Sequence, residues 1–192
     1  MTGKRAATKE RNAIALVSAA RRLFTEHGYQ GVGIETIAAE AGLTTGAIYS
    51  LFGAKHGLLL AVLADTQGRI EAAVRDDASA LEVATAYVHA YHDFVTTPGG
   101  WRALRLEVES LALVMHEEAV RERITALDEA RTARLAGLLA GRRVGSRRLD
   151  LTESRRTAIA LSALLQGLSR QHALRPHATD PGLWTDAALK LF

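Results

Sequence analysis

The feature that most limits what this chain can fold into is its scarcity of proline, with only three in 192 residues. Proline interrupts a helix, because it lacks a backbone N–H and its ring clashes with the preceding turn. Apolar side chains recur at helical spacing along most of the chain, and we find no convincing β-alternation and no internal repeat. The sequence therefore predicts an all-α fold with about nine helices.

Glycine and threonine mark several of the expected helix ends. Gly28 and Gly42 suit the position after a helix, while Gly33, Thr44 and Thr152 suit the position before one. We predict a loop at residues 141–150. The predicted helices are residues 11–27, 34–41, 45–52, 55–77, 81–97 (closed by Pro98-Gly99-Gly100), 101–115 and 117–140, followed by one that opens at Thr152 and a short one within 179–192.

The first three predicted helices are short, and the turns between them carry glycine. Three such helices within about 45 residues indicate a helix-turn-helix unit. A unit of this kind can recognise DNA or serve as plain packing, so the pattern alone leaves both interpretations open.

The net charge of +3 is concentrated at one end of the chain. Residues 1–55 hold seven Lys/Arg and four acidic residues, whereas the remaining residues hold 17 of each sign. A polyanionic partner would therefore be met at the N-terminal quarter. The alternative is that the excess arises by chance or only keeps the chain in solution. Arg142, Arg143, Arg147 and Arg148 suggest a second nucleic-acid site, but a solvated loop is the preferred interpretation.

Composition limits the other possible partners. Apolar residues are 48% of the chain and charged residues 23%, so a packed core is expected. The absence of cysteine excludes disulfides and thiolate metal sites, and is compatible with the reducing cytoplasm in which we expect the protein to act. No apolar run approaches the roughly 18 residues of a membrane span, so no membrane partner is expected. We expect neither a metal nor a cofactor.

The residues GLTTGAIYSLFGAKHGLL, at 42–59, contain the candidate DNA-reading helix. Side chains that read base edges must be small or polar, and Thr45, Ala47 and Ser50 fit that need. Thr44 begins a helix whose free amides can meet phosphate, and the Tyr49 hydroxyl is long enough to reach the DNA backbone. The predicted DNA-binding residues are Thr44, Thr45, Gly46, Ala47, Tyr49, Ser50 and Lys55.

Three of these side chains also have explanations that do not involve DNA. Tyr49 could be a core tyrosine, and Ala47 could be an ordinary helix residue. Lys55 stands at a helix start, where the helix dipole disfavours a cation, so a nearby phosphate would explain it. A lysine that is merely solvated is the alternative.

The run from Leu23 to Leu59 also resembles the N-terminal DNA-binding domain of TetR-type transcriptional regulators. The matching residues stand in register without a gap: Leu23, Phe24, Gly28, Tyr29, Ile37, Ala38, Ala41, Gly42, Gly46, Tyr49, Phe52, Lys55, Leu58 and Leu59. The resemblance implies a homodimer that binds an inverted-repeat operator in double-stranded DNA, and a repressor that a small-molecule effector releases. It also implies a basic N-terminal arm (1–10), a helix-turn-helix DNA-binding domain (11–54) and an effector-binding and dimerisation domain (55–192).

Several positions depart from the usual pattern of that family. Gly33 stands where a threonine usually caps the second helix and touches phosphate. Thr45 stands where lysine or another polar residue is common, and Ala47 and Ser50 replace a frequent threonine and a frequent histidine. Gly53-Ala54 and His56 replace a proline, a capping residue and an acid. We therefore expect fewer phosphate contacts than usual and a fourth helix that frays at its start. DNA binding should then depend more on the basic arm, which carries Lys4, Arg5, Lys9 and Arg11.

A single helix-turn-helix reads only half of a two-fold site, so a dimer interface is expected. The two C-terminal helices carry broad apolar faces that could form a four-helix bundle with a second copy, although both faces could instead pack internally. The predicted interface residues are Leu161, Leu164, Leu165, Leu168, Leu183, Trp184, Ala187 and Leu191. By resemblance, the middle helices hold the effector. The candidates that combine polar groups with apolar surface are Tyr87, Tyr91, His92, Trp101, Arg105, Met115, His116 and Gln166.

Two other classes of protein were weighed. A small helical metal-binding enzyme is disfavoured, because no acidic pair accompanies His89 and His92, and His116-Glu117-Glu118 is not the H-E-x-x-H zinc pattern. No nucleophile elbow, phosphate loop or dinucleotide fingerprint is present, so we expect no enzyme. A helical adaptor that binds only protein is the remaining alternative. Strongly salt-dependent binding to duplex DNA would separate a regulator from both.

Overall fold

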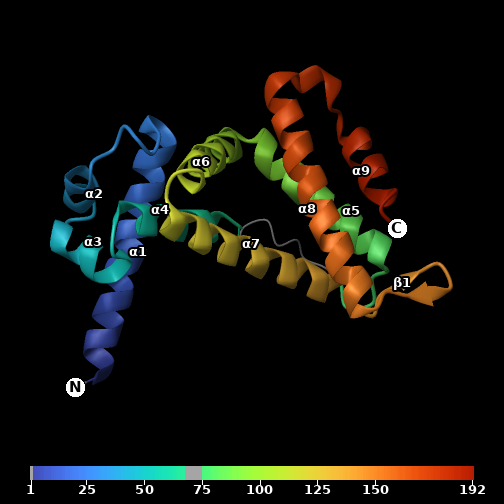
Figure 1. The fold of residues 1–192 in the computed structure, drawn as a ribbon, viewed down its shortest axis with the longest axis horizontal. Coiled ribbons are helices and arrows are strands. Elements are labelled where there is room, and N and C mark those ends of the chain that lie inside the picture. The colour runs from blue at the N-terminus through green and yellow to red at the C-terminus, as the bar shows by residue number, and fades with distance from the viewer. Residues whose placement is uncertain (1, 68–74) are drawn as a thin grey trace. The chain divides into compact units, whose positions relative to one another are not determined.

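The computed structural model describes residues 2–67 and 75–192. Within those ranges the chain forms nine α-helices, one 3₁₀ helix and one two-stranded hairpin (Figure 1). The predicted all-α fold is confirmed. The elements are α1 (Thr2–His27), α2 (Ile34–Glu40), α3 (Thr45–Phe52), α4 (Lys55–Gln67), α5 (Ala80–Thr96), α6 (Pro98–Val114), α7 (Glu118–Leu139), β1 (Arg143–Val144), β2 (Arg147–Arg148), α8 (Leu151–Leu174), η1 (Pro176–Ala178) and α9 (Pro181–Leu189).

The chain divides into two compact units. Unit 1 contains Met1–Thr66 and Arg102–Ile124, and unit 2 contains Gln67–Trp101 and Thr125–Phe192. Helices α6 and α7 therefore each contribute residues to both units. The predicted boundary after residue 54 separates a DNA-binding part from an effector-binding part, and it does not coincide with the boundary between the two compact units. The functional division stays a prediction.

Unit 1 is built around one apolar cluster to which α1, α2, α3, α4 and α6 all contribute. Phe24, Ile37, Ile48 and Leu58 are fully buried in it, and Leu106 of α6 is nearly so. The ring of Phe24 meets Tyr29 edge to face, with the two centroids 5.3 Å apart. This cluster fixes the positions of α1, α2 and α3 relative to one another.

Unit 2 has a separate core formed by α5, α7, α8 and α9. Trp184 of α9 lies at its centre, fully buried, and the neighbouring rings are Tyr91, His92 and His172. Leu161 and Leu165 of α8 are buried in the same cluster. The apolar faces of α8 and α9 therefore pack against α5 of their own chain to a large extent.

The first helix begins at Thr2 rather than at the predicted Arg11. Residues 2–10 are rich in Ala, Lys, Arg and Glu, which are strong helix formers. They carry no apolar periodicity, so a prediction based on periodicity placed the start of the helix too late. The segment that we expected to be an arm is helical.

Two further boundaries differ from the prediction around residues 68–100. The described part of α4 ends at Gln67, residues 68–74 lie outside the described residues, and 75–79 are not helical, so the predicted end at Asp77 is wrong. Ser79 instead caps α5, since its hydroxyl accepts from the Glu82 N–H at 3.3 Å while its own N–H donates to the Glu82 carboxylate at 2.7 Å. The break expected at 98–100 is a single residue, because Pro98 already opens α6.

Residues 141–150, expected to form a loop, contain a short antiparallel hairpin in which β1 pairs with β2. Gly145 in its turn has φ of +61°, a conformation that glycine adopts without strain. Strands of two residues are too short to show alternation, so the sequence pattern could not reveal them. The N-cap of α8 is Asp150 rather than the predicted Thr152, and Asp150 forms a capping box with Glu153.

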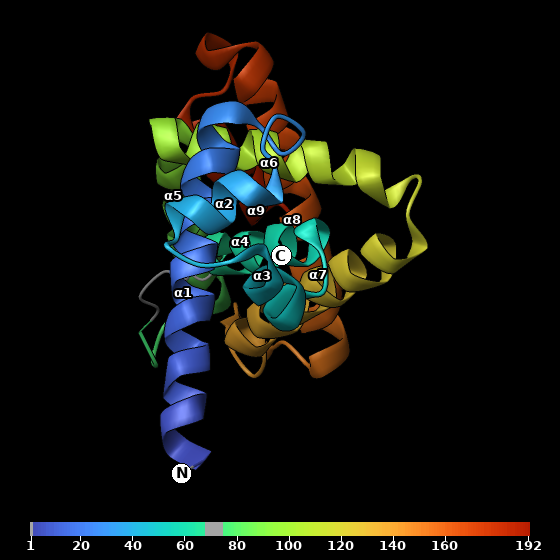
Figure 2. The ribbon, with the colours of Figure 1, turned by 90° about the vertical axis from the view of Figure 1, so that its left-hand side faces the viewer.

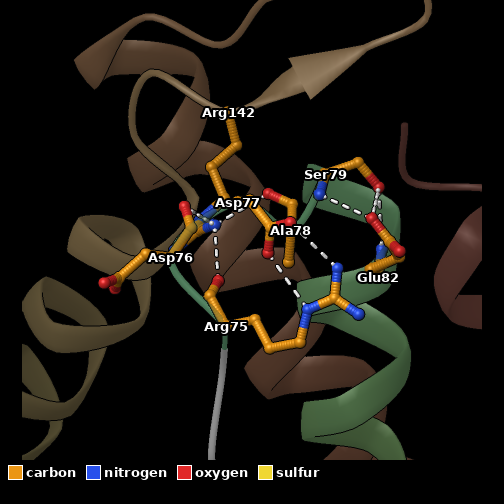
Figure 3. A network of polar contacts seen from close by, with 7 residues as sticks. All are labelled: Arg75, Asp76, Asp77, Ala78, Ser79, Glu82 and Arg142. Carbon is orange, nitrogen blue, oxygen red and sulfur yellow. Dashed lines mark hydrogen bonds and ion pairs between the residues drawn. The ribbon is translucent and has the colours of Figure 1, made fainter.

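Arg142 connects the hairpin with the segment that precedes α5 (Figure 3). Its Nη1 donates to the carbonyl oxygens of Arg75, Asp76 and Ala78 at 3.0, 3.0 and 2.7 Å, and its Nε donates to the carbonyl of Leu138 at 2.7 Å. The guanidinium of Arg75 bonds to the carboxylate of Asp77, and this contact lowers the pKa of Asp77. Arg142 therefore holds the segment before α5 against the end of α7 and the start of the hairpin.

Two other arginines of the hairpin also have protein partners. Arg147 pairs with Glu153 at 2.7 Å, and Arg148 donates to the carbonyl of Gly141 at 2.6 Å. These contacts favour a structural role for Arg142, Arg147 and Arg148 over a second nucleic-acid site.

Within the described ranges, no single helix has both the length and the apolarity needed to cross a membrane. By length and composition alone, one bent pair of helices, Thr45–Phe52 with Lys55–Asp65, could do so.

Replacing Arg142 with alanine should lower the free energy of unfolding by about 1 to 2 kcal/mol, because hydrogen bonds from a charged donor to carbonyls are lost. Arg143→Ala is the matched control: this exposed side chain lies next in the chain, and its loss should change stability by less than about 0.5 kcal/mol. Urea unfolding followed by circular dichroism measures both. Equal stabilities of the two variants would contradict the bridging role of Arg142.

Candidate nucleic-acid interface

The turn between α2 and α3 is set by glycine. Gly42 has φ of +65°, and its N–H donates to the carbonyl of Ala39 at 3.1 Å. The N–H of Leu43 donates to the carbonyl of Ala38 at 2.9 Å. This pair of hydrogen bonds is a Schellman motif, which ends a helix and redirects the chain through a left-handed residue. The predicted role of Gly42 is confirmed.

Helix α3 has the predicted bounds, and one side chain anchors it. Ile48 is fully buried in the core of unit 1, while Ala47, Leu51 and Phe52 are half-buried against the same cluster. Ile48 and Phe52 therefore tie α3 to the neighbouring helices of unit 1. Helix α3 presents its remaining surface to solvent.

The side chains predicted to contact DNA lie mainly on that outward surface. Gly46 and Ser50 are exposed, and Thr45 and Ala47 are half-buried. Tyr49 is 55% exposed, so it is not a core tyrosine. The structure thus brings these five positions together on one short helix.

The start of α3 is open to an anion. Thr44 occupies the N-cap position, but its side chain makes no cap hydrogen bond, and no acidic residue stands in the first turn. The first amides of a helix have no partner within the helix, and the helix dipole makes this end positive. An incoming phosphate would meet these amides and the Thr44 hydroxyl.

Lys55 has a partner that the sequence did not reveal. Its Nζ lies 4.3 Å from the centroid of the Tyr29 ring, a cation–π distance. Burial lowers the pKa of the Lys55 ammonium group, and burial together with the charge of Glu117 raises the pKa of the Tyr29 phenol. The ring of Tyr29 therefore accounts for Lys55 at a helix start without a phosphate, although the two roles are compatible.

Helix α6 holds the turn that follows α1. The carboxylate of Glu109 accepts from the N–H of Tyr29 at 2.7 Å, and Arg105 donates to the carbonyls of Phe24 and Thr25 at 3.4 and 3.3 Å. Gly28 beside them has φ of +76°, and a Cβ there would lie 3.1 Å from the Glu109 carboxylate. We call this set of contacts the α6 clamp, and no signal in the sequence pointed to it.

The arginines in the second half of α1 are neutralised by acids of neighbouring helices. Arg21 forms an ion pair with Asp65 of α4, and Arg22 forms one with Glu40 of α2. The basic residues of α1 that remain for a polyanion therefore lie in the first turns of that helix. Arg5, Thr8, Lys9 and Asn12 line a groove of about 560 Å³ together with Ala47, Ser50 and Leu51 of α3.

The candidate effector residues fall into both units. Tyr87 and Tyr91 are buried and His92 is half-buried in the core of unit 2, where His92 meets the Trp184 ring at 5.2 Å between centroids. Gln166 accepts from the guanidinium of Arg131 when its amide oxygen faces that group. Trp101 is exposed at the edge of the same unit.

The other three candidates belong to unit 1. Arg105 is engaged in the α6 clamp, Met115 is 79% exposed, and His116 is exposed. The two grooves of unit 1 that are lined by residues of α1 do not include any of these three side chains. Their assignment to an effector site stays a prediction.

The candidate dimer residues differ in exposure. Leu161, Leu165 and Trp184 are buried in the core of their own chain, and Leu164, Leu168, Ala187 and Leu191 are half-buried. Leu183 is 42% exposed. The large exposed apolar side chains that the sequence reasoning missed on α8 are Leu151, Ile159 and Leu174, at 78%, 50% and 68% exposure. Helical periodicity showed that these helices carry buried faces, but not what covers each face.

Residues 2–67 and 75–192 contain no group of three or more His, Asp or Glu side chains placed to hold a metal ion.

Together, the short turn, the anchored α3 and the outward row of small side chains define a helix-turn-helix unit. Residues 16–62, which contain this unit, match the family model described as bacterial regulatory proteins, tetR family. This match confirms, for that part of the chain, the predicted resemblance to TetR-type regulators. Members of this family are regulators rather than enzymes, in agreement with the expectation of no enzyme.

Known proteins resemble the chain beyond this unit. The HTH-type transcriptional repressor AcnR of Corynebacterium efficiens is 28% identical over 123 residues, which are 63% of this chain and 62% of the repressor. The chain thus spans about three fifths of that relative's length. A solved structure described as a TetR-family transcriptional regulator from Rhodococcus sp. superimposes with a TM-score of 0.72 at 21% identity, over 94% of this chain and 96% of that one. The multidrug binding protein EbrR complexed with ethidium gives a TM-score of 0.70 at 21% identity, over 94% and 98% of the two chains.

Replacing Glu109 with alanine should lower the free energy of unfolding by about 2 kcal/mol, because the buried N–H of Tyr29 loses its acceptor. Amide hydrogen exchange at Tyr29 should accelerate in the same variant. Val108→Ala on the same helix is the control, since Val108 is 56% exposed and its truncation should cost less than about 0.5 kcal/mol. Unchanged exchange at Tyr29 in Glu109→Ala would contradict the clamp.

Proposed function

We propose that the protein is a homodimeric, sequence-specific DNA-binding transcriptional regulator, a repressor that a small-molecule effector releases from its operator. The observation that carries this proposal is α3, which buries Ile48 and presents Thr45, Ala47, Tyr49 and Ser50 outward. A helix of this kind fits the major groove, where small polar groups and methyls reach base edges.

Each outward side chain then has a defined role. Thr45, Ala47 and Ser50 read bases, the first and last through hydroxyls and the second through its methyl group. Thr44 and Tyr49 hold phosphates, together with Lys55 when its side chain reaches past the ring of Tyr29. The two-fold symmetry of a dimer would place two such helices on an inverted repeat, with half-sites about 34–36 Å apart or a multiple of this.

The dimer face that the exposure pattern supports lies on α8. Ile159, Ala163, Gly167 and Leu174 are all exposed and share one side of this helix. Small residues among larger apolar ones allow two helices to approach closely. Leu164 and Leu168 flank this face, and Leu183 of α9 is the exposed apolar residue of the last helix.

The effector site proposed for the core of unit 2 is supported by buried polar atoms without partners among the described residues. These atoms are Arg131 Nε, Ser162 Oγ and Trp184 Nε1. A buried donor without an acceptor is costly, so each of them favours a ligand that carries hydrogen-bond acceptors. The rings of Tyr91, His92 and Trp184 would add an apolar surface for it. EbrR, with a related fold, binds the small molecule ethidium. Such a ligand would regulate DNA binding only if it binds the DNA-bound and free states unequally.

Where the protein acts is part of the same proposal. A repressor of this kind would work in the cytoplasm, beside the DNA that it binds.

The decisive experiment is the selection of bound duplexes from a random DNA pool by the purified protein at roughly physiological salt. Enrichment of an inverted repeat would support a sequence-specific dimer and supply the operator for a screen of effectors by release. No enrichment, even at low salt, would contradict the proposal and favour a protein-binding adaptor.

On the selected operator, Thr45→Ala should relax base preference at one position of each half-site, by about 1–3 kcal/mol of discrimination. Tyr49→Phe should instead weaken binding to all sequences about equally, because a phosphate contact carries no sequence information. Repeating the selection with each variant measures both effects. A uniform loss of affinity for Thr45→Ala, with unchanged preference, would refute its base-reading role.

Gly167→Arg should convert the dimer into a monomer, because a long charged side chain would stand in the proposed α8 face. Nothing lies within 4 Å of a Cβ at Gly167, so the variant should still fold. Gly137→Arg on α7 is the matched control, since a Cβ there also has nothing within 4 Å. Sedimentation of the two variants decides the matter: a dimeric Gly167→Arg would place the interface elsewhere.

A further inference from the structure

The first turns of α1 form one wall of a groove beside the base-reading helix. Figures 1 and 2 both show α1 continuing toward its N-terminus beyond α3. Arg5, Thr8, Lys9 and Asn12 follow the pattern i, i+3, i+4, i+7, so they share one face of α1. This face lines the groove whose opposite wall carries Ala47, Ser50 and Leu51 of α3. We call it the α1 groove.

The α1 groove is positively charged and lacks neutralising acids. Within residues 5–67 and 75–192, no ion pair joins Arg5 or Lys9 to an acidic residue, whereas Arg21 and Arg22 farther along α1 each have one. Like charges four residues apart mildly destabilise a helix, so folding stability does not account for Arg5 and Lys9 on the same face. Their position is explained if the groove receives a polyanion.

We propose that the α1 groove binds the phosphodiester backbone of the duplex whose bases α3 reads. This inference rests on the proposed function, and it adds a second DNA-contacting element with a defined face. Arg5 and Lys9 contact phosphate oxygens, and the amide of Asn12 donates a hydrogen bond to the same strand. Ser50 lies on the boundary of the groove, so the base-reading surface of α3 continues directly into this phosphate-binding surface.

The helical form of this segment distinguishes the proposal from binding by a flexible arm. A flexible arm would use its basic residues interchangeably, whereas a helix aims each side chain in a fixed direction. Arg11 tests the difference: it is exposed, bonds to Thr8 at 3.3 Å and does not line the groove. Lys9 and Arg11 carry the same charge two residues apart, on different sides of one helix.

The experiment compares full-length wild type, Lys9→Gln and Arg11→Gln on the operator from the duplex selection. Affinity is measured at a series of salt concentrations. Lys9→Gln should lower the steepness of the salt dependence by about 1.8 for a dimer, because each lost phosphate contact removes about 0.9 from the slope. Arg11→Gln should leave the slope near its wild-type value. Base preference should be unchanged in both variants.

A second pair of variants tests the helix itself. Ala6→Gly with Ala7→Gly keeps every charge but loosens the first turns of α1, since glycine is a poor helix former. This double variant should bind operator more weakly than wild type. Lys9→Gln in the same background should then have a smaller effect than in wild type, because a loosened helix no longer aims Lys9 into the groove.

The outcomes separate the two proposals. Equal losses of slope for Lys9→Gln and Arg11→Gln would overturn the groove and indicate a flexible arm. A wild-type slope for Lys9→Gln, on an operator that wild type binds, would also overturn the groove while leaving the proposed function intact. Failure of wild type to bind any duplex would overturn both.

Discussion

A helix of eight residues is not stable in water by itself, and the proposed DNA-reading surface of this protein lies on such a helix. Isolated helices shorter than about 12–15 residues are marginal even with favourable sequences. Helix α3 therefore owes its shape to the burial of Ile48 and to the Schellman turn before it. Because one face does the anchoring, the opposite face is released from packing and its residues can be chosen for contact with bases. The departures at Thr45 and Ser50 from the usual family pattern fall on this released face.

The support for α3 comes from farther along the chain than a local unit would suggest. Helix α6 contributes Leu106 to the core that holds Ile48, and the α6 clamp fixes the end of α1 and the N–H of Tyr29. Tyr29 in turn lies beneath the ammonium group of Lys55 at the start of α4. Contacts from two distant parts of the chain, α6 and the start of α4, thus converge on a single turn at Gly28 and Tyr29. Gly28 and Tyr29 are among the residues that carry the family resemblance, and these contacts give a physical reason for their presence.

The sequence was sufficient where a local rule decides the structure. Glycine after α2, the bounds of α3 and the burial of Ile48 follow from turn chemistry and helical period. It was insufficient where the deciding contact is distant or weak. Glu109 bonds to a residue 80 positions away, and no pattern announces such a pair. The first turns of α1 are helical because their residues have high helix propensity, although they show no apolar periodicity. Asp150 and Thr152 are both good N-cap residues only two positions apart, so the sequence did not show which of them caps α8. Leu161 and Trp184 were correctly seen as members of apolar faces, but period alone cannot say whether such a face meets its own chain or another.

The discontinuity of unit 1 bears on how such a protein can be recombined. A DNA-binding domain that ended at residue 54 could be exchanged between proteins and joined to any regulatory domain. Here Arg102–Ile124 belongs to the same compact unit as Met1–Thr66, so that unit closes only when a segment from the middle of the chain returns to it. A chimaera that exchanges the first 54 residues alone would keep a foreign α6 against the new α1, without matched partners for Tyr29 and Gly28. In proteins of this architecture, the N-terminal helices and α6 should therefore evolve together. A substitution in one of these two segments should favour a compensating substitution in the other.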